Sequence, residues 1–306
     1  MDSVVNKINH LFSKQGLYYF IYYSVRLFGI DRIMSDKLYL KLKYRCYIGK
    51  KLNLSSPTTF NEKLNWLKLY NRKPIYTVMV DKYEVKDYVA SIIGSQYIIP
   101  TLGVWDKAED IDWDALPNKF VLKCTHDSGS IVICKDKQLL DIKSVSRKLN
   151  KSLRRDCYRS GREWPYKNVK HRIIAEKYME DKQTKELRDY KFFCFNGDVK
   201  CMFIATDRQK EGESVKFDFF DANFVHMNMK HGHDNASILP QKPNNFELMK
   251  TLASKLSQDI PFLRVDFYEI DNEVFFGELT FFHHNGTTKF EPDTWDKVLG
   301  DWIVLP

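Results

Sequence analysis

The apolar positions of the chain change their spacing at about residue 95. Before this point the spacing is helical throughout. Thr59 to Glu62 has the pattern of a capping box, which predicts a helix with Leu64, Leu67 and Leu69 inside. A second helical segment runs from Thr77 to Ile93, and we expect Gly94 to end it.

After this point, short apolar runs rich in β-branched and aromatic residues predict strands. The expected strands are residues 97–100, 120–124, 131–134, 172–179, 190–195, 199–204 and 215–220. Two patterned helices lie among them, at residues 141–155 and 244–258. The chain carries no internal repeat and no low-complexity linker.

Two further apolar runs, residues 264–267 and 276–281, flank a polar turn that contains Asp271-Asn272. Because such a pair reverses a chain readily, we expect an antiparallel hairpin. The hairpin would place Asp266 and Glu278 on adjacent strands. Ionised carboxylates in an apolar hairpin need a counter-charge, and paired oxygen ligands suit Mg²⁺ with nucleotide phosphates. The alternative is that both acids point to solvent from a polar face.

The composition of the chain limits the classes of ligand and partner that we expect. The 306 residues include 48 Lys and Arg against 40 Asp and Glu, a net charge of +8, which favours an anionic ligand or a polyanionic partner. No nucleic-acid fingerprint is present, so we expect no nucleic acid. The six cysteines show neither CxxC nor zinc spacing, which is typical of reduced thiols in a cytoplasmic protein.

The most apolar stretch, residues 16–29, is too short to cross a bilayer. The start at Met1-Asp2-Ser3 does not have the pattern of a signal peptide. Four basic residues flank the stretch: Lys7, Lys14, Arg26 and Arg32. It therefore predicts either a helix packed on the protein itself or an interfacial helix at the inner face of a membrane.

Lys123 lies near the end of an apolar strand and precedes a small polar turn. A lysine in this place can meet a phosphate that the backbone N–H groups of the turn also bind. The turn residues are Thr125, His126, Asp127, Ser128, Gly129 and Ser130. Turns of this composition also occur in hairpins that bind no ligand.

Two other segments carry candidate groups. Lys82, considered alone, belongs to a solvated helix face. The strand that ends in Glu176, Lys177 and Tyr178 can offer backbone groups to an adenine edge, and an acid further on, such as Asp189, can accept ribose hydroxyls.

In this order the segments resemble the ATP-grasp superfamily and, more closely, the TupA-like ATP-grasp family of bacterial surface-polysaccharide loci. The resemblance runs from Asn61 to Trp302. It is carried by residues 60–64, 76–83, 120–129, 161–168, 189–197 and 262–268. It implies an α+β ATP-grasp fold, in which two α+β lobes grip ATP, with a helical N-terminal region at residues 1–75. Within the ATP-grasp region at 76–306, it implies a lead-in at 76–118, a small nucleotide-binding lobe at 119–180 and a metal-binding lobe at 181–306.

The resemblance also implies roles for single residues. Lys82 and Lys123 would bind phosphates, and the loop from Thr125 to Ser130 would close over the triphosphate. Residues 176–178 would form the adenine hinge, with Asp189 on the ribose.

The implied chemistry is centred on the hairpin. Asp266 and Glu278 would hold Mg²⁺, and Arg264 beside them would act with Lys123 on the transferring phosphoryl group.

Two departures from the family pattern concern the substrate. Thr280 stands where the superfamily commonly has Asn, and Phe282-His283-His284-Asn285-Gly286 replaces a Pro/Ser/Gly loop. Thr280, His283 and His284 are therefore candidate substrate residues. A His-His pair without a third ligand at suitable spacing is only a weak indication of zinc.

The implied reaction is ATP- and Mg²⁺-dependent ligation of a carboxylate to an amine through an acylphosphate, on a small-molecule or glycan substrate of bacterial capsule, O-antigen or teichuronopeptide-type synthesis. One alternative is a glycosyltransferase that uses Asp112-Trp113-Asp114. A sugar kinase with the same phosphate site is a second, and a degenerate non-catalytic nucleotide-binding module is a third.

Overall fold

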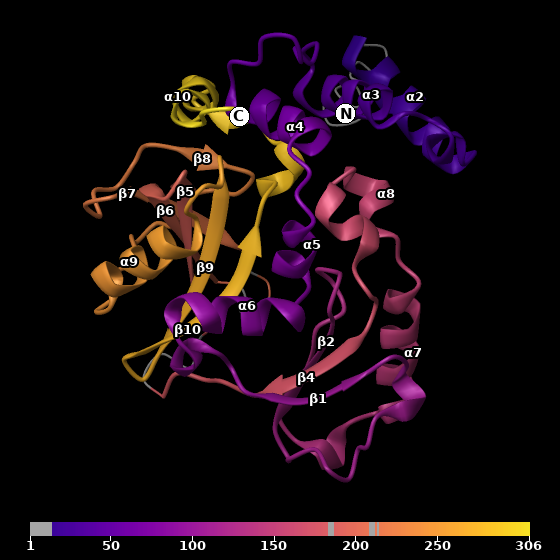
Figure 1. Ribbon diagram of the computed structural model, residues 1–306, viewed down its shortest axis with the longest axis vertical. Helices are drawn as coiled ribbons and strands as arrows, with labels where there is room; N and C mark the ends of the chain where they lie inside the picture. The colour runs from indigo at the N-terminus through magenta and orange to yellow at the C-terminus, as the bar shows by residue number, and fades with distance from the viewer. Residues whose placement is uncertain (1–13, 183–186, 208–211, 213) are drawn as a thin grey trace.

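A computed structural model describes residues 14–182, 187–207, 212 and 214–306. The first thirteen residues of the expected helical region, which include Met1-Asp2-Ser3 and Lys7, lie outside the described part. Figure 1 shows the N-terminal helices at the top of the molecule, above two separate groups of strands.

Helices α2 (Lys14–Leu27), α3 (Asp36–Ile48) and α4 (Phe60–Tyr70) form the N-terminal region, with the short 3₁₀ turn η1 (Ile30–Arg32) between the first two. The predicted capping box is confirmed, because Thr59 and Glu62 bond each other's backbone N–H groups. The expectation of helix throughout was wrong at residues 49–59. There Asn53 Oδ1 accepts the N–H groups of Ser55 and Ser56, which favours a turn over a helix.

The predicted helix from Thr77 to Ile93 is two helices, α5 (Ile75–Val80) and α6 (Glu84–Ile93). Asp81 Oδ1 accepts the N–H groups of Tyr83 and Glu84 at 2.8 and 3.2 Å, so its side chain interrupts one helix and begins the next. Lys82 therefore lies in the break and not on a helix face, which corrects its predicted placement. Gly94 ends α6 at φ +110°, as expected.

The smaller sheet has four antiparallel strands in the order β1-β4-β2-β3. They are β1 (Thr101–Trp105), β2 (Phe120–Cys124), β3 (Val132–Cys134) and β4 (Ile173–Lys177). Helix α7 (Ile142–Leu153) packs on the sheet beside β2. The predicted strand at residues 97–100 was wrong, because η2 (Ser95–Tyr97) is a 3₁₀ turn and the strand begins at Thr101.

The larger sheet has five antiparallel strands in the order β10-β9-β5-β6-β7. They are β5 (Asp189–Phe195), β6 (Asp198–Thr206), β7 (Lys216–Asp221), β9 (Leu263–Ile270) and β10 (Glu273–Thr280). Helix α9 (Phe246–Leu256) contacts β5, β6 and β9, and in Figure 1 it lies beside these strands. The helix expected at residues 244–258 is thus confirmed.

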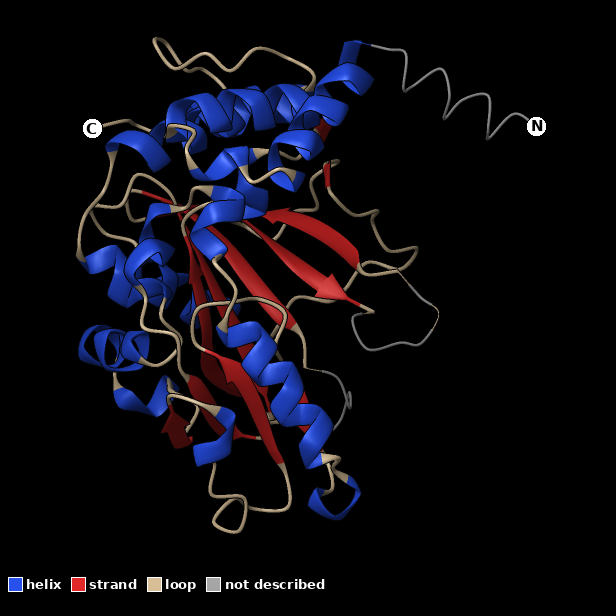
Figure 2. Cartoon of the chain, turned by 90° about the vertical axis from the view of Figure 1, so that its right-hand side faces the viewer, coloured by secondary structure: helices blue, strands red, loops and turns tan. Residues whose placement is uncertain are grey.

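Short elements complete the described chain. They are η3 (Ala108–Asp110), η4 (Lys137–Leu139), α8 (Cys157–Gly161), η5 (Trp164–Asn168), β8 (Lys230–His231), η6 (His283–Gly286), β11 (Phe290–Glu291) and α10 (Thr294–Trp302). β8 and β11 pair with each other, and α10 packs on α4. In the side view of Figure 2, helices lie along the top and the left of the molecule, and the strands run between them.

Two main groups of buried side chains correspond to the two sheets. The larger group joins sheet β10-β9-β5-β6-β7 to α4 and α9, with Phe193 in ring contact with Phe60, Phe203 and Phe262. The smaller group lies between sheet β1-β4-β2-β3 and α7. The fold is thus the α+β arrangement of two lobes that the resemblance implied. The exact lobe boundaries stay a prediction. Phe60 of α4, in the predicted N-terminal region, packs in the core of the larger lobe.

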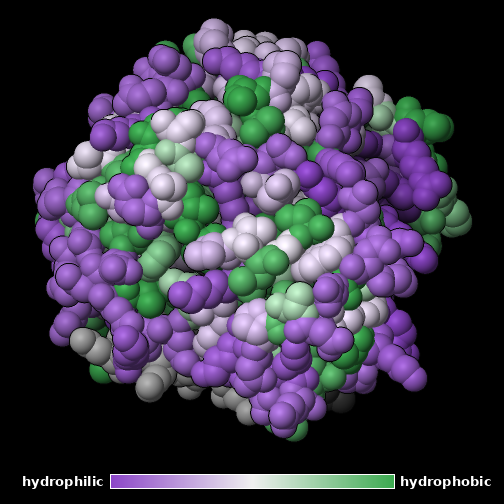
Figure 3. Space-filling view, turned by 60° about the horizontal axis from the view of Figure 1, so that its bottom comes forward, coloured by the Kyte–Doolittle hydropathy of each residue, from purple (hydrophilic) through white to green (hydrophobic). Residues whose placement is uncertain are grey.

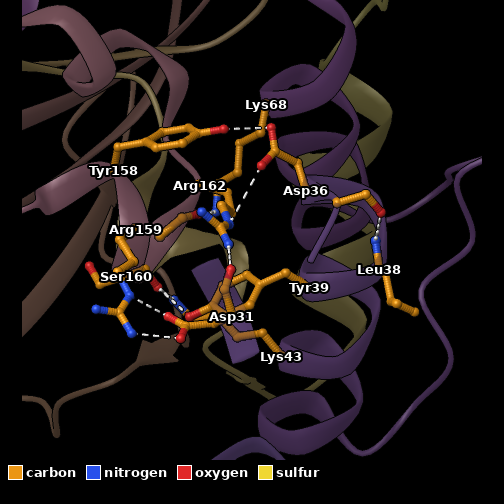
Figure 4. A network of polar contacts seen from close by, with 12 residues as sticks. Asp31, Asp36, Leu38, Tyr39, Lys43, Lys68, Tyr158, Arg159, Ser160 and Arg162 are labelled. Carbon is orange, nitrogen blue, oxygen red and sulfur yellow. Dashed lines mark hydrogen bonds and ion pairs between the residues drawn. The ribbon is translucent and has the colours of Figure 1, made fainter. Parts of the chain in front are cut away.

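The N-terminal helices are bound to α8 by a network of charged contacts (Figure 4). Asp31 is fully buried and accepts two hydrogen bonds from the Arg159 guanidinium, at 2.5 and 2.6 Å. Arg162 donates to the backbone oxygen of Asp31, and Tyr158 donates to Asp36 at 2.6 Å. Because these contacts join segments more than 120 residues apart, they hold the two parts of the chain together.

All six cysteines are free thiols, and all except the half-buried Cys157 are buried, consistent with the reduced thiols that the sequence predicted. On the face shown in Figure 3, small apolar groups are separated by polar side chains. No helix among the described residues is long and apolar enough to cross a membrane.

Candidate functional site

The predicted hairpin is confirmed as β9 and β10, which reverse at Asp271 and Asn272 with φ of +49° and +67°, as a two-residue hairpin turn requires. Glu278 pairs directly with Asp266. A bulge at Gly277 sets this register, because Phe276 pairs with Phe267 and Gly277 is the extra residue. The two carboxylates therefore lie on the same face of adjacent strands, as expected.

Asp266 is buried and already neutralised by neighbours on the same sheet face. The Arg264 guanidinium donates to both of its oxygens at 2.7 Å, and Lys191 on β5 also donates to it. Burial alone would raise the pKa of Asp266, but Arg264 and Lys191 hold this pKa below its usual value. The carboxylate is therefore ionised and fixed in direction.

Glu278 is the more accessible acid, with 34% of its side chain exposed. Its contacts are long: Lys82 Nζ lies 3.9 Å from Oε1, and Arg264 Nη2 lies 3.6 Å from Oε2. Two residues further along β10, the hydroxyl of Thr280 is buried and has no hydrogen-bond partner among the described residues. Residues two apart on a strand face the same side, so Thr280 and Glu278 share one face.

This donor set fits Mg²⁺. Mg²⁺ prefers hard oxygen ligands and usually takes one or two carboxylates together with water and phosphate oxygens. Asp266 and Glu278 supply the carboxylates, and Thr280 supplies an unused hydroxyl. Arg264 and Lys191 bond Asp266 but leave Glu278 without a short contact, so one carboxylate remains open to a cation.

On the facing sheet, two lysines share one buried acid. Glu176 on β4 accepts Lys123 Nζ at 2.5 Å and Lys86 Nζ at 2.7 Å. Burial raises the pKa of Glu176, but Lys123 and Lys86 outweigh burial and lower it. The sequence indicated Glu176 as an adenine contact, and the structure shows its carboxylate positioning two cations.

Between these two sheets lies a cavity of about 320 Å³, in the range of small-molecule sites. Of the predicted site residues, those that line it are Lys82, Lys123, Glu176, Lys177 and Tyr178. Its apolar lining residues are Val85, Ile98, Ile99, Val121, Ile131, Ile133, Met179, Leu187, Tyr268 and Phe276. Gly277, next to Glu278, also lines it, so the cavity reaches the hairpin. A pocket lined by apolar side chains and by lysines suits a nucleotide base and its phosphates.

Lys82 connects the cavity to the polar turn. Its backbone N–H donates to Thr125 O at 3.0 Å and its Nζ donates to Asp127 O at 2.7 Å. The turn is folded onto itself, since Ser130 Oγ bonds both Asp127 Oδ1 and the N–H of Cys124. Only Ser128 and Gly129 of the predicted loop are exposed. The loop does not line the cavity, and its closure over phosphates stays a prediction.

Asp189 is buried on β5 and lies 3.2 Å from Lys191 Nζ, outside the cavity lining. In the structure Asp189 therefore lies beside Lys191, which bonds Asp266, and not in the lining of the cavity. Its ribose role stays a prediction.

The substrate candidates lie at the far end of β10. His283 is only 1% exposed, packs on Phe193 and Phe203, and accepts a hydrogen bond from Arg264 Nη1 at 2.9 Å on its Nδ1. His284 is half-buried. His283 could contact a substrate only after its side chain moved.

Sequence reasoning missed Lys86, Lys191 and His231. Lys86 lies in a helix with the charged neighbours of a solvated face, and Lys191 lies within an apolar strand. Lys191 follows Asp189 by two residues, so the alternation of the strand could have placed it on the same face.

The Asp112-Trp113-Asp114 string has a local structural role. Asp112 Oδ1 accepts the N–H groups of Asp114 and Ala115 at 3.1 Å each, which closes an exposed turn. Neither aspartate lines the cavity. This arrangement gives no support to a metal-binding pair of a glycosyltransferase.

Comparison with solved structures finds matches at low sequence identity. They include the D-alanine–D-alanine ligase of Helicobacter pylori, at 14% identity and TM-score 0.39, covering 72% of this chain and 61% of that one. The ATP-grasp ligase PsnB complexed with minimal precursor matches at 9% identity and TM-score 0.40, covering 72% and 59%. The D-alanine–D-alanine ligase of Bacillus anthracis matches at 14% identity and TM-score 0.38, covering 66% and 57%. The chain thus spans about three fifths of the length of these proteins or slightly less, and likeness at this level carries no argument about activity.

A search of curated proteins finds no match. The family model described as TupA-like ATPgrasp matches residues 62–304, well over half of the chain. The matched range contains both sheets, the cavity between them and the acidic hairpin. This chain belongs to the TupA-like ATP-grasp family.

Proposed function

We propose that this chain is an ATP- and Mg²⁺-dependent ligase that joins a carboxylate to an amine. The observation that carries the proposal is that Lys82 and Lys123 line one cleft between two sheets, and that this cleft reaches Gly277, next to the Asp266–Glu278 pair. Lys82 comes from one side of this cleft and lies 3.9 Å from Glu278 on the other. Such an arrangement suits a triphosphate whose charge must be balanced by cations from several directions.

We assign the following binding roles to the residues of the cleft. The apolar cavity holds the base, while Lys123 and Lys82 bind phosphate oxygens. Glu176 keeps Lys123 directed into the cleft, because the pair is held at 2.5 Å. Mg²⁺, when bound by Asp266, Glu278 and the Thr280 hydroxyl, supplies charge neutralisation of the phosphates.

Arg264 lies beside these acids and faces the place where the γ-phosphate would be transferred. In the first step a carboxylate oxygen of the substrate attacks the γ-phosphorus and the bond to the β-phosphate oxygen breaks, giving ADP and an acylphosphate. In the second step an amine attacks the acyl carbon, inorganic phosphate leaves, and the nitrogen loses a proton to give an amide. Arg264 stabilises charge on the transferring group, since its guanidinium is fixed by Asp266.

We further propose that the carboxylate or the amine belongs to a sugar acid or an amino-acid substituent of a bacterial surface polysaccharide. The family membership supports this substrate class. The protein would then work at the inner face of the membrane, where such glycans are assembled.

The test is a reaction with ATP, Mg²⁺ and a panel of uronic acids and amino acids. A ligase releases one ADP and one phosphate for each amide, and the amide is detected by its mass. A sugar kinase would release ADP and retain the phosphate on the product. Activity that needs a nucleotide sugar and no ATP would contradict the proposal.

A further inference from the structure

Three histidine rings from two distant segments meet beside the site. His231 ends β8, and His283 and His284 belong to η6, 52 residues further along the chain at the nearest. Each ring offers one nitrogen, and these nitrogens all lie within 4.8 Å of one another. The sequence indicated the pair in η6 but gave no third ligand, because only the fold brings β8 next to it.

One nitrogen of each ring is buried and has no hydrogen-bond partner. These atoms are Nδ1 of His231, Nε2 of His283 and Nε2 of His284. A buried polar atom without a partner is destabilising, so three such atoms in neighbouring rings indicate a ligand that bonds them. The described residues offer no such partner.

The surroundings fix two of the rings in place. His231 stacks on Phe290 with ring centroids 3.8 Å apart and an angle of 2° between the planes. Its Nε2 lies 3.2 Å from Thr288 O, so Nε2 carries the proton and Nδ1 presents a lone pair. His283 is held between Phe193 and Phe203. A ring whose second nitrogen bonds a carbonyl oxygen, inside an apolar shell, is the usual form of a metal-bound histidine.

We propose that His231, His283 and His284 form a binding site for a divalent late transition metal, Zn²⁺ in preference, distinct from the Mg²⁺ pair of the hairpin. Three imidazoles with one position left for water match the ligand type and number of known three-histidine zinc sites. The proposal assigns His283 and His284 to a metal and not to the substrate. Its test is independent of the ligase proposal, because metal binding requires neither ATP nor turnover.

A surface groove lies beside the site. It is lined by Gly232, His233, Thr287 and Thr288, which follow the ligands by one to four residues in the chain. His233 lies in this groove with its ring centroid 6.3 Å from that of His284.

Metal binding requires one contact to change. Arg264 Nη1 donates to Nδ1 of His283, which leaves the proton on Nε2, the atom that would bind the metal. Moving this proton to Nδ1 frees Nε2 but ends the hydrogen bond from Arg264. The guanidinium can lose this bond and keep its place, because its other two nitrogens bond Asp266. The metal site is thus linked to the arginine of the proposed active site.

The experiment is a titration of the metal-free full-length protein with Co²⁺, whose visible absorption reports nitrogen ligands in tetrahedral geometry, followed by displacement with Zn²⁺. We expect one equivalent to bind. His284→Asn removes one ligand and suits the left-handed backbone at φ +46°. His231→Phe removes another and keeps the stacking on Phe290. Each should weaken binding by more than the about 10–100-fold that loss of an outer-shell partner costs.

Two control variants should keep the absorption of the wild type. His226→Asn changes a half-buried histidine outside the cluster, and Glu278→Gln removes one acid of the Mg²⁺ pair. Circular dichroism checks that each variant is folded. If His231→Phe does not fold, the result for His284→Asn alone tests the proposal. No absorption with Co²⁺ in the wild type would overturn the proposal and leave a bridging water as the occupant of the cluster. Absorption that survives in His284→Asn, or is lost in Glu278→Gln, would overturn it as well.

Discussion

Glu278 is the acid of the hairpin that remains open to a cation, because Asp266 is already bonded by Arg264 and Lys191. Glu278→Gln keeps the shape of the side chain and removes its charge. We expect the rate of ADP formation to fall by about 10²–10³, the usual loss for one preorganised charge. The measurement is ADP release at saturating ATP and Mg²⁺.

Glu273→Gln is the matched control for this change, since Glu273 is exposed at the opposite end of the same strand. It should retain the rate of the wild type. Equal rates for Glu278→Gln and Glu273→Gln would contradict the role of the hairpin in binding Mg²⁺.

Glu176 makes the stability of the protein depend on pH in the acid range. Its pKa in the folded protein lies below its ordinary value of 4.5, because Lys123 and Lys86 favour the charged form over the effect of burial. The unfolded chain therefore binds more protons in this window. The stabilisation is fully present above about pH 4.5 and is lost as pH falls through the lower folded pKa.

Glu176→Gln leaves two lysines without their counter-charge and should lower the free energy of unfolding by about 3–5 kcal/mol at neutral pH. Urea unfolding at several pH values measures it. The difference from the wild type should shrink as pH falls below about 4.5. A constant difference over this range would show that the Glu176 charge does not stabilise the fold.

At the residue scale, the sequence identifies the residues that match a family pattern. It misses the residues whose contacts arise only when distant segments fold together. Lys82, Lys123, Asp266 and Glu278 were all named as candidates; Lys82 and Lys123 line one cavity, and Lys82 lies 3.9 Å from Glu278 at its edge. Lys86 was not, because only its burial against Glu176 distinguishes it from a lysine on a solvated helix face. His231 was not, because nothing in its local sequence indicates contact with η6.

Among the elements, those with a strong local signal were predicted correctly in kind and position, although β9 and β10 each extend three residues further toward their turn than expected. The β9–β10 hairpin has both alternating strands and a turn pair with positive φ, and α4 has its capping box. The strand β1 was placed four residues too early. Its residues Thr101 and Leu102 are exposed and Gly103 carries no side chain, so its apolar pattern is weak.

The interruption between α5 and α6 was missed for a related reason. The spacing of apolar residues continues through Asp81, and only the hydrogen bonds of its carboxylate to Tyr83 and Glu84 reveal the break. This local choice matters, since it directs Lys82 toward the turn at Asp127.

The attachment of the N-terminal helices to α8 gives a prediction at the element scale. Asp31→Asn keeps the size of a buried side chain but removes the charge that accepts two bonds from Arg159. Arg159 can reach water in part, so we expect a loss of about 1–3 kcal/mol in the free energy of unfolding. Urea unfolding followed by circular dichroism measures this change.

Asp110→Asn serves as the comparison, because Asp110 makes an exposed ion pair with Lys107 that contributes little. A loss for Asp31→Asn no larger than that for Asp110→Asn would show that the network in Figure 4 does not hold the helices.

At the scale of the whole molecule, one surface carries apolar side chains beside basic ones. Phe20, Leu27 and Phe28 on and after α2 are 67, 81 and 75% exposed, and Arg26 and Arg32 line a groove next to them. Such a surface suits the boundary of an anionic bilayer. We propose that the protein binds vesicles that contain anionic lipid, and that added salt weakens this binding.

Co-sedimentation with vesicles tests this proposal. Phe20→Ser combined with Leu27→Ser should abolish binding. Ile238→Ser changes an apolar residue that is 85% exposed on a loop outside α2, and it should leave binding unchanged. Equal sedimentation of the three proteins would refute the membrane contact and leave α2 as a helix of the protein surface.

The central claim is that the cleft between the two sheets binds a nucleotide together with Mg²⁺. Isothermal titration with a non-hydrolysable ATP analogue, with and without Mg²⁺, tests it most directly. We expect the wild type to bind one analogue per chain far more tightly with Mg²⁺, Glu278→Gln to lose the effect of Mg²⁺, and Lys123→Ala to weaken binding in both conditions. Lys143→Ala, on the exposed face of α7, should behave as the wild type. Nucleotide binding that is absent, or that Mg²⁺ and both site variants leave unchanged, would contradict the account.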